Sequence, residues 1–341
     1  MLRNTVRHHL LSILVPMALS LCTTTFVCAA VAPAPNPSPA DSSPPLQEVT
    51  VVGRMDTPKL NHEIQQFVKS HAKPGAHIGQ VGRWRENVCP TVSGLQGPVD
   101  DLVSHRITDV ARAVGAPTRA AGKTCDVNVE VVFTPSPQGL VDRIAKVYRP
   151  MLGYFPTAER QQALTFSRPV QAWYVTGTRS LDYQPPIDSA AAASPSAGNF
   201  AGAVTDMYAP GLHLDSYDSA DSKAGFAPSG IAGSRISKGL RSEFVHVLVI
   251  VDSKAVAKLP VQSISDYIAM LALTRLASAD VCSELPSIVN LLATGCSAAP
   301  TTITSADIAY LKGLYGANLE QNLNVEQADM HEVMRREMLR P

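Results

Sequence analysis

The sequence contains few charged residues and few aromatic residues, and neither sign of charge is in excess. Charged residues make up 17% of the 341 residues and aromatic residues 6%, and basic and acidic residues number 29 each. A nucleic-acid-binding protein is expected to cluster basic residues on one surface, and electrostatic membrane binding needs a similar excess. We therefore expect no nucleic acid and no charged membrane surface as a partner.

Several compact motifs of enzymes and metal proteins are also missing. The chain has no H-E-x-x-H, no C-x-x-C and no G-x-S-x-G elbow, so the common zinc sites and the α/β-hydrolase nucleophile are not expected. Ser70 and Lys73 have S-x-x-K spacing, but a solvated last helical turn explains the pair more simply. Residues 122–124 (Gly-Lys-Thr) end like a phosphate-binding loop, although the earlier glycine of that loop is absent. No metal and no cofactor are therefore expected.

The first thirty residues have the order of a secretory signal peptide. Arg3 and Arg7 form a basic start, residues 10–21 are mainly apolar, and small residues precede position 31. The alternative is a single membrane anchor, but a spanning helix needs about 20 apolar residues, and a proline and a run of threonines interrupt this stretch. We expect cleavage near Val31, a periplasmic or secreted protein, and no membrane insertion after cleavage.

Four cysteines remain beyond this segment: Cys89, Cys125, Cys282 and Cys296. An even number of cysteines in an exported chain favours disulfides, and four cysteines allow three pairings. The pairs Cys89–Cys125 and Cys282–Cys296 are favoured, because each closes a local loop between expected elements.

Composition divides the rest of the chain into a tether and a domain. Residues 31–47 contain six prolines among small and polar residues, which indicates a disordered tether. Residues 48–341 are expected to form a single α+β domain, with a small mixed sheet flanked by helices and a helical C-terminal part. A segment at about 180–230, rich in Gly, Ala, Ser and Asp, is expected to be a flexible insertion that can fold over a ligand.

Hydrophobic periodicity and helix-end signals predict the individual elements. His246 falls inside the last expected strand and is interpreted as a satisfied interior or edge histidine. Helices are expected from Thr57 onward and at 100–114, 137–148, 264–276, 285–293, 305–315 and 325–338, and strands at 49–52, 127–133 (half-buried), 170–176 and 244–251.

Two groups of residues are candidates for ligand binding. Arg83, Trp84 and Arg85 form the densest aromatic–basic cluster of the chain. Arginine stacked on tryptophan can build a recognition surface, and the alternative is that the cluster anchors a loop near Cys89. His213 and Asp215 lie among further acids in the expected insertion and could hold a hard cation, although the spacing differs from that of a calcium loop.

A set of short segments is spread through most of the chain after the signal region: Gly82-Arg83-Trp84, Val88-Cys89-Pro90, Arg106-Ile107, Val110-Ala111, Val114-Gly115, Cys125, Asn128 and the strand to Phe133, Ser265-Asp266-Tyr267, Ala269-Met270, Ser287-Ile288, Thr304 through Asp307, Leu311, Leu314 and Tyr315. These segments resemble a group of uncharacterised exported proteins of Gram-negative bacteria. The order of elements also resembles secreted zincin-like domains, in which the metal-bearing helix corresponds to residues 264–276. That segment contains neither histidine nor glutamate, so the resemblance implies a member without the metal site.

Residues 48–54 (E-V-T-V-V-G-R) resemble the opening of TonB-dependent receptors, but no long series of alternating strands follows. The expected function is that of an exported envelope protein without catalytic activity, which binds an envelope protein or a small ligand. One alternative is a peptidase-like hydrolase with a non-standard active site. Another is a structural accessory protein that adds the strand at 49–52 to a partner.

Overall fold

The computed structural model describes residues 57–340 except 76–78, 121–122, 124, 154, 156–158, 181–239, 278–281, 297–298 and 318–320. The expected signal segment, the tether, the strand at 49–52 and nearly all of the insertion lie outside the described residues. The described residues all belong to one compact unit.

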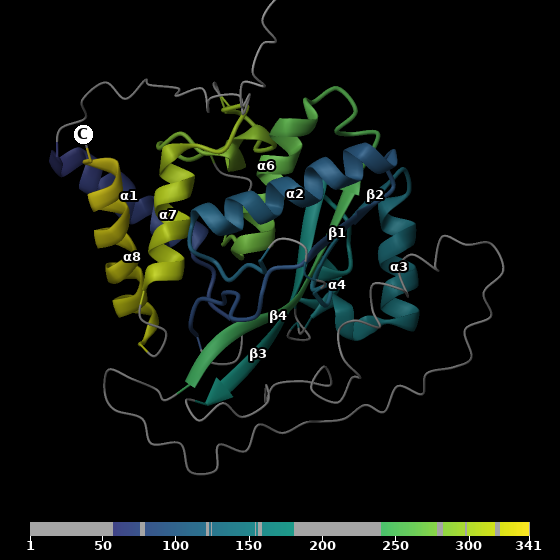
Figure 1. The fold of residues 1–341 in the computed structure, drawn as a ribbon, viewed down its shortest axis with the longest axis horizontal. Helices are drawn as coiled ribbons and strands as arrows, with labels where there is room; N and C mark the ends of the chain where they lie inside the picture. Colours follow the sequence, from purple (N-terminus) through teal and green to yellow (C-terminus); the bar gives the residue numbers. More distant parts are fainter. Residues whose placement is uncertain are drawn as a thin grey trace, which may run out of the picture. The chain divides into compact units, whose positions relative to one another are not determined.

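A four-stranded mixed sheet forms the centre of this unit, in the order β1-β2-β4-β3 (Figure 1). β1 (Pro90–Ser93), β2 (Val129–Thr134) and β4 (Leu240–Asp252) are parallel, whereas β3 (Val170–Ser180) runs antiparallel to β4. β2 and β4 are rich in valine and isoleucine, which suit strands that are buried on both faces. β4 is longer than β2, so its residues 240–246 extend past the end of β2.

Helices cover both faces of the sheet. α2 (Gly97–Ala113) and α6 (Val261–Leu273) pack against each other on one face, and α3 (Pro137–Val147) and the 3-10 turn η1 (Arg149–Leu152) cover the other. The remaining helices are α1 (Thr57–His71), α4 (Arg160–Ala163), the 3-10 turn η2 (Ile288–Leu291), α7 (Ser305–Gly316) and α8 (Leu323–Met338). α8 packs against both α1 and α7, and α1 also contacts α7 through Phe67 and Tyr310 (Figure 1).

Alternate residues of the central strands face two separate hydrophobic cores. Val131 and Val249 face the larger core below α2 and α6, whereas Val132, Ile250 and Trp173 face the smaller core below α3 and η1. The strand predicted at 127–133 is present as β2, but the prediction that it is half-buried is wrong. Every residue of β2 is buried, because helices cover its second face as well.

The α+β class, the small mixed sheet and the helical C-terminal part are confirmed. The helix expected at 285–293 is only the single turn η2, and β1 was not predicted. Among the described residues, no helix combines the length and the apolar character that crossing a membrane requires.

Both expected disulfides are present. Cys89 is bonded to Cys125 across a separation of 36 residues, and Cys282 to Cys296 across 14. The local-loop argument therefore selected the observed pairing among the three possible ones.

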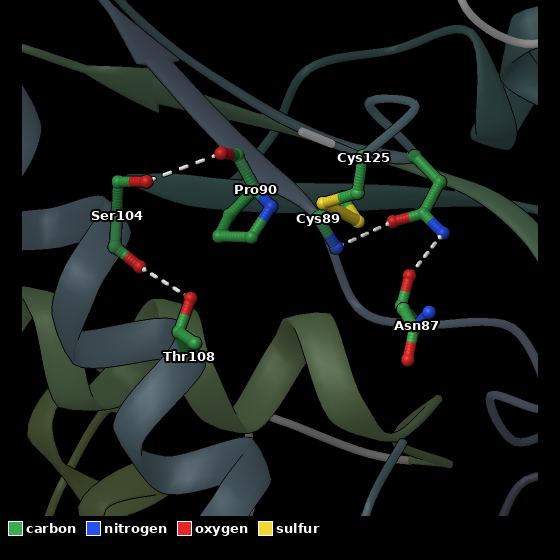
Figure 2. Close-up of a disulfide and its surroundings, with 7 residues drawn as sticks. Asn87, Cys89, Pro90, Ser104, Thr108 and Cys125 are labelled. Atoms are coloured by element: carbon green, nitrogen blue, oxygen red, sulfur yellow. Dashed lines mark hydrogen bonds between the residues drawn. A yellow bond between two sulfur atoms is a disulfide. The ribbon is translucent and has the colours of Figure 1, made fainter. Parts of the chain in front are cut away.

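The first disulfide holds the start of β1 (Figure 2). The amide of Asn128 bridges two chain segments, because its Oδ1 accepts the N–H of Cys89 at 2.9 Å and its Nδ2 donates to the carbonyl of Asn87 at 2.9 Å. On the other side, the hydroxyl of Ser104 in α2 donates to the carbonyl of Pro90 at 3.1 Å. The disulfide, the amide and the helix therefore fix a strand that is too short to hold its place alone.

Candidate functional site

Five ionisable side chains lie on or beside the amino-terminal half of β4, and we call them the charged cluster: Arg85, Glu130, Arg241, Glu243 and His246. They form one group of three around Glu243 and one pair between Glu130 and His246. Four of the five are buried, and Arg85 reaches the surface. A cluster of buried ionisable groups is a candidate functional site.

The local backbone explains why these residues meet. β4 extends past the end of β2 at residues 240–246, and there the stretch after α1 takes the place of β2. Arg83 forms a parallel bridge with Glu243, and the N–H of Phe244 donates to the carbonyl of Arg83 at 3.0 Å. On the opposite side β3 continues the pairing beyond a bulge at Val175/Thr176. Polar residues of β4 are thereby held in a strand whose neighbours on both sides are distant in sequence.

Two guanidinium groups share the carboxylate of Glu243. The Nε of Arg241 donates to Glu243 Oε1 at 2.7 Å, and the Nε of Arg85 lies 3.7 Å from the same oxygen. The side chain of Arg85 is 32% exposed, against 3% for that of Glu243. This part of the cluster therefore presents an oriented guanidinium to solvent, with a buried carboxylate behind it.

Glu130 and His246 form the second part of the cluster. The Nε2 of His246 lies 3.7 Å from Glu130 Oε1, and both residues are buried. Glu130 of β2 pairs in register with Leu248, so His246 is the next residue on the same face of β4. A carboxylate beside an imidazole is a combination that general acid–base catalysis uses. Sequence reasoning missed Glu130, because the alternation of β2 placed it on an exposed face.

Arg83 and Trp84 lie inside the protein. Arg83 donates to the carbonyls of Leu314 and Ala317 at the end of α7, the latter at 3.0 Å. The indole N–H of Trp84 donates to the carbonyl of Ala272 at 2.8 Å. Their packing corresponds to the alternative weighed from the sequence, in which the cluster anchors a loop, and Arg85 alone of the three reaches solvent.

Arg83 also faces a buried carboxylate. One of its terminal nitrogens lies 3.9 Å from Glu326 Oε1, and the other carboxylate oxygen accepts the N–H of Val81 at 3.0 Å. Burial lowers the pKa of Arg83 to about 10, against an attraction from Glu326 that raises it. Arg83 therefore stays charged at neutral pH and ties α8 to the stretch that pairs with β4.

The other two candidates from the sequence, His213 and Asp215, lie outside the described residues. No set of three or more His, Cys, Asp or Glu side chains suited to a metal ion occurs in the part of the chain that the structure describes.

The segments that carry the family resemblance contact one another in the core. Arg106 donates to Asp266, which links α2 to α6. Ser287 donates to Asp307 at 2.5 Å, and Asn128 holds the backbone beside the first disulfide. These contacts stabilise the fold. The residues that carry the resemblance therefore have structural roles here.

Comparison with known proteins identifies no relative. No protein-family model, no curated protein and no solved structure matches the chain. The resemblance to exported zincin-like domains therefore stays a prediction, and function has to be argued from the geometry of the cluster.

Proposed function

We propose that the protein is exported to the periplasm and acts there by binding a small ligand or an envelope protein, without catalysing a reaction. Export is supported by the two disulfides, because structural disulfides persist mainly in oxidising compartments. The signal-like order of the first thirty residues supports it independently.

The observation that carries the binding role is the group around Glu243. Burying ionised groups costs several kcal/mol each unless partners compensate them, and apolar residues at 241 and 243 would avoid that cost. The pairing of Arg241 with Glu243 holds the carboxylate that orients Arg85. A guanidinium held in a fixed orientation at the surface is suited to recognise an acidic group of a ligand.

This proposal is tested by asking whether the protein retains a bound ligand through purification, which we call ligand carry-over. The full chain is expressed with its first thirty residues in a Gram-negative host, released from the periplasm under native conditions, denatured, and its extract examined by mass spectrometry. We expect the extract of the wild-type protein to contain a bound compound, which stays chemically unchanged after long incubation with the protein. The extract of Arg85→Gln should contain less of this compound than that of the wild type. Arg112→Gln is the matched control, because Arg112 is an exposed arginine paired with its helix neighbour Asp109. Equal depletion in both variants would contradict the proposal, as would retention in the cytoplasm.

One observation favours a second function, that of a hydrolase. Glu130 and His246 form a buried acid–imidazole pair, which is the kind of pair that general acid–base catalysis uses. If the protein hydrolyses peptide or ester substrates, Glu130→Gln and His246→Gln should each abolish turnover while the fold, measured by circular dichroism, is kept. Turnover that survives both substitutions would reject this pair as the catalytic one.

A further inference from the structure

Two cations lie together where α1 and α6 end. The N–H of Lys73 donates to the carbonyl of Arg275 at 3.0 Å, so the two backbones are joined directly. The Cζ of Arg275 lies 6.0 Å from the centre of the Tyr174 ring on β3. Both cations are partly buried. Within the described residues, neither charged group has a hydrogen bond or an ion pair to a protein side chain.

Further charges surround the pair. Burial, and after it the charge of Arg275, lower the pKa of Lys73, and Arg168 acts in the same direction. Arg168 lies in the turn before β3 and is the third cation of the group. Glu159 opposes them, since its carboxylate raises the pKa of both Lys73 and Arg275. Lys73 and Arg275 therefore share the influence of one carboxylate, and Arg168 adds a further positive charge near Lys73.

The ends of the helices explain part of this arrangement. Carbonyl groups at a helix C-terminus carry roughly half an elementary charge in total, and Lys73 and Arg275 follow the ends of α1 and α6. That partial charge is smaller than the full charge of each cation. The helix ends help to hold the cations in place but leave most of their charge to be balanced by another group.

Tyr174 fixes the position of Arg275. Its hydroxyl donates to the carbonyl of Leu271 at 2.8 Å and lies 3.1 Å from that of Thr274, so the ring is tied to the last turn of α6. The guanidinium lies over this fixed ring, an arrangement favoured by cation–π attraction. Its donors are thereby oriented in advance of any ligand.

The hydrogen bonds of Ser70 do not support a role for Lys73 in activating it as a nucleophile. The hydroxyl of Ser70 donates to the carbonyl of Phe67 at 3.0 Å and lies 2.9 Å from His71 Nδ1. It is bonded within the last turn of α1, which agrees with the simpler interpretation of the S-x-x-K spacing.

We propose that Lys73 and Arg275, with Arg168 beside them, bind a phosphate-type oxyanion, either free or as the end group of a larger molecule. The planar fork of Arg275 suits two oxygens of such a group, and Lys73 supplies a point charge to a third. This site differs from the charged cluster, so its test is independent of the proposed function.

Calorimetric titration of the full mature chain with inorganic phosphate, at constant ionic strength maintained with chloride, tests the site. We expect saturable binding of one phosphate per chain, weakened about tenfold or more by Lys73→Gln and by Arg275→Gln. Lys69→Gln is the matched control, because it removes an exposed positive charge from the last turn of the same helix. Its affinity should stay within about twofold of that of the wild type.

A second ligand, phenyl phosphate, and a second variant, Arg275→Lys, complete the experiment. Phenyl phosphate should bind more tightly than inorganic phosphate if the natural ligand is a larger molecule, and more weakly if it is the free ion. Arg275→Lys keeps the charge but loses the fork, so it should bind with intermediate affinity and guards against a variant that merely misfolds. Absence of saturation with both anions would overturn the proposal, and so would equal weakening by Lys69→Gln and Lys73→Gln. Either result would leave ligand carry-over at Arg85 unaffected.

Discussion

His71 is a single residue that should make the stability of the protein depend on pH. It is buried, its ring stacks on Phe67 with centroids 3.8 Å apart, and its Nδ1 lies 2.9 Å from the carbonyl of Phe67. Burial lowers the pKa of His71 from 6.5 to about 4, although the hydrogen bond to Phe67 raises it. The imidazole is therefore neutral in the folded protein at pH 7.

The sign of the pH effect follows from this lowered pKa. The unfolded chain takes up the proton of His71 near pH 6.5 and the folded chain only near pH 4. The contribution of His71 to the free energy of unfolding is therefore fully present above about pH 6.5. It decreases as the pH falls towards 4, and the loss amounts to about 2 to 3 kcal/mol at pH 4.5. Urea unfolding at pH 7 and pH 4.5 measures this decrease.

His71→Phe should remove most of the decrease, because phenylalanine can stack on Phe67 but does not titrate. His62→Gln is the control, since His62 lies on the exposed face of the same helix. If the free energy of unfolding decreases between the two pH values as much in His71→Phe as in the wild type, another group is responsible.

Asp307 should be the residue whose loss destabilises the C-terminal helices most. Its carboxylate accepts hydrogen bonds from Ser287 Oγ at 2.5 Å, Ile288 N at 2.8 Å and Thr304 N at 2.9 Å, and it is fully buried. Asp307→Ala leaves these donors unpaired, so we expect the free energy of unfolding to fall by about 3 kcal/mol. Chemical denaturation should show a fall of under about 0.5 kcal/mol for the exposed control Asp109→Ala. Similar losses in both variants would refute the role of this network.

At the scale of elements, local signals located most helices. The helix predicted at 305–315 is α7, whose N-cap is Thr304, with Asp307 completing a capping box. The helix predicted at 100–114 is α2, and Gly115 adopts a positive φ of 80° just beyond its end. Signals of this kind depend only on neighbouring residues, so they can be read without knowledge of the fold.

Elements that depend on distant partners were less predictable. β1 contains Pro90 and Ser93 and has no alternating pattern, and it is a strand because β2 pairs with it in parallel. The amino-terminal half of β4 contains Arg241 and Glu243, which do not indicate a strand. It is extended because β3 pairs along its whole length.

The two disulfides should differ in their effect on stability. In the loop-entropy model, closing 36 residues by Cys89–Cys125 contributes about 4 kcal/mol, and closing 14 by Cys282–Cys296 about 3 kcal/mol. Urea unfolding of the two double Cys→Ser variants should therefore rank the Cys89/Cys125 variant as the less stable. Equal stability of both variants and the wild type would show that neither loop constrains the unfolded chain.

At the scale of the whole molecule, the fold class and the disulfide pairing could be predicted from the sequence, but the charged cluster could not. Its members come from the stretch after α1, from β2 and from β4, and only the sheet topology brings them together. Arg85 was a candidate because of its aromatic–basic neighbours. The sequence did not mark Glu130 or Glu243 as site residues, because an acidic residue in or beside a strand normally faces solvent.

The central claim is that this chain is an exported protein that binds a ligand, and native mass spectrometry of the protein released from the periplasm tests it most directly. We predict a chain that begins near Val31, that has no free thiol because both disulfides are formed, and that carries a noncovalent adduct lost on denaturation. A chain that retains Arg3, contains free thiols and carries no adduct in its native spectrum would contradict the account.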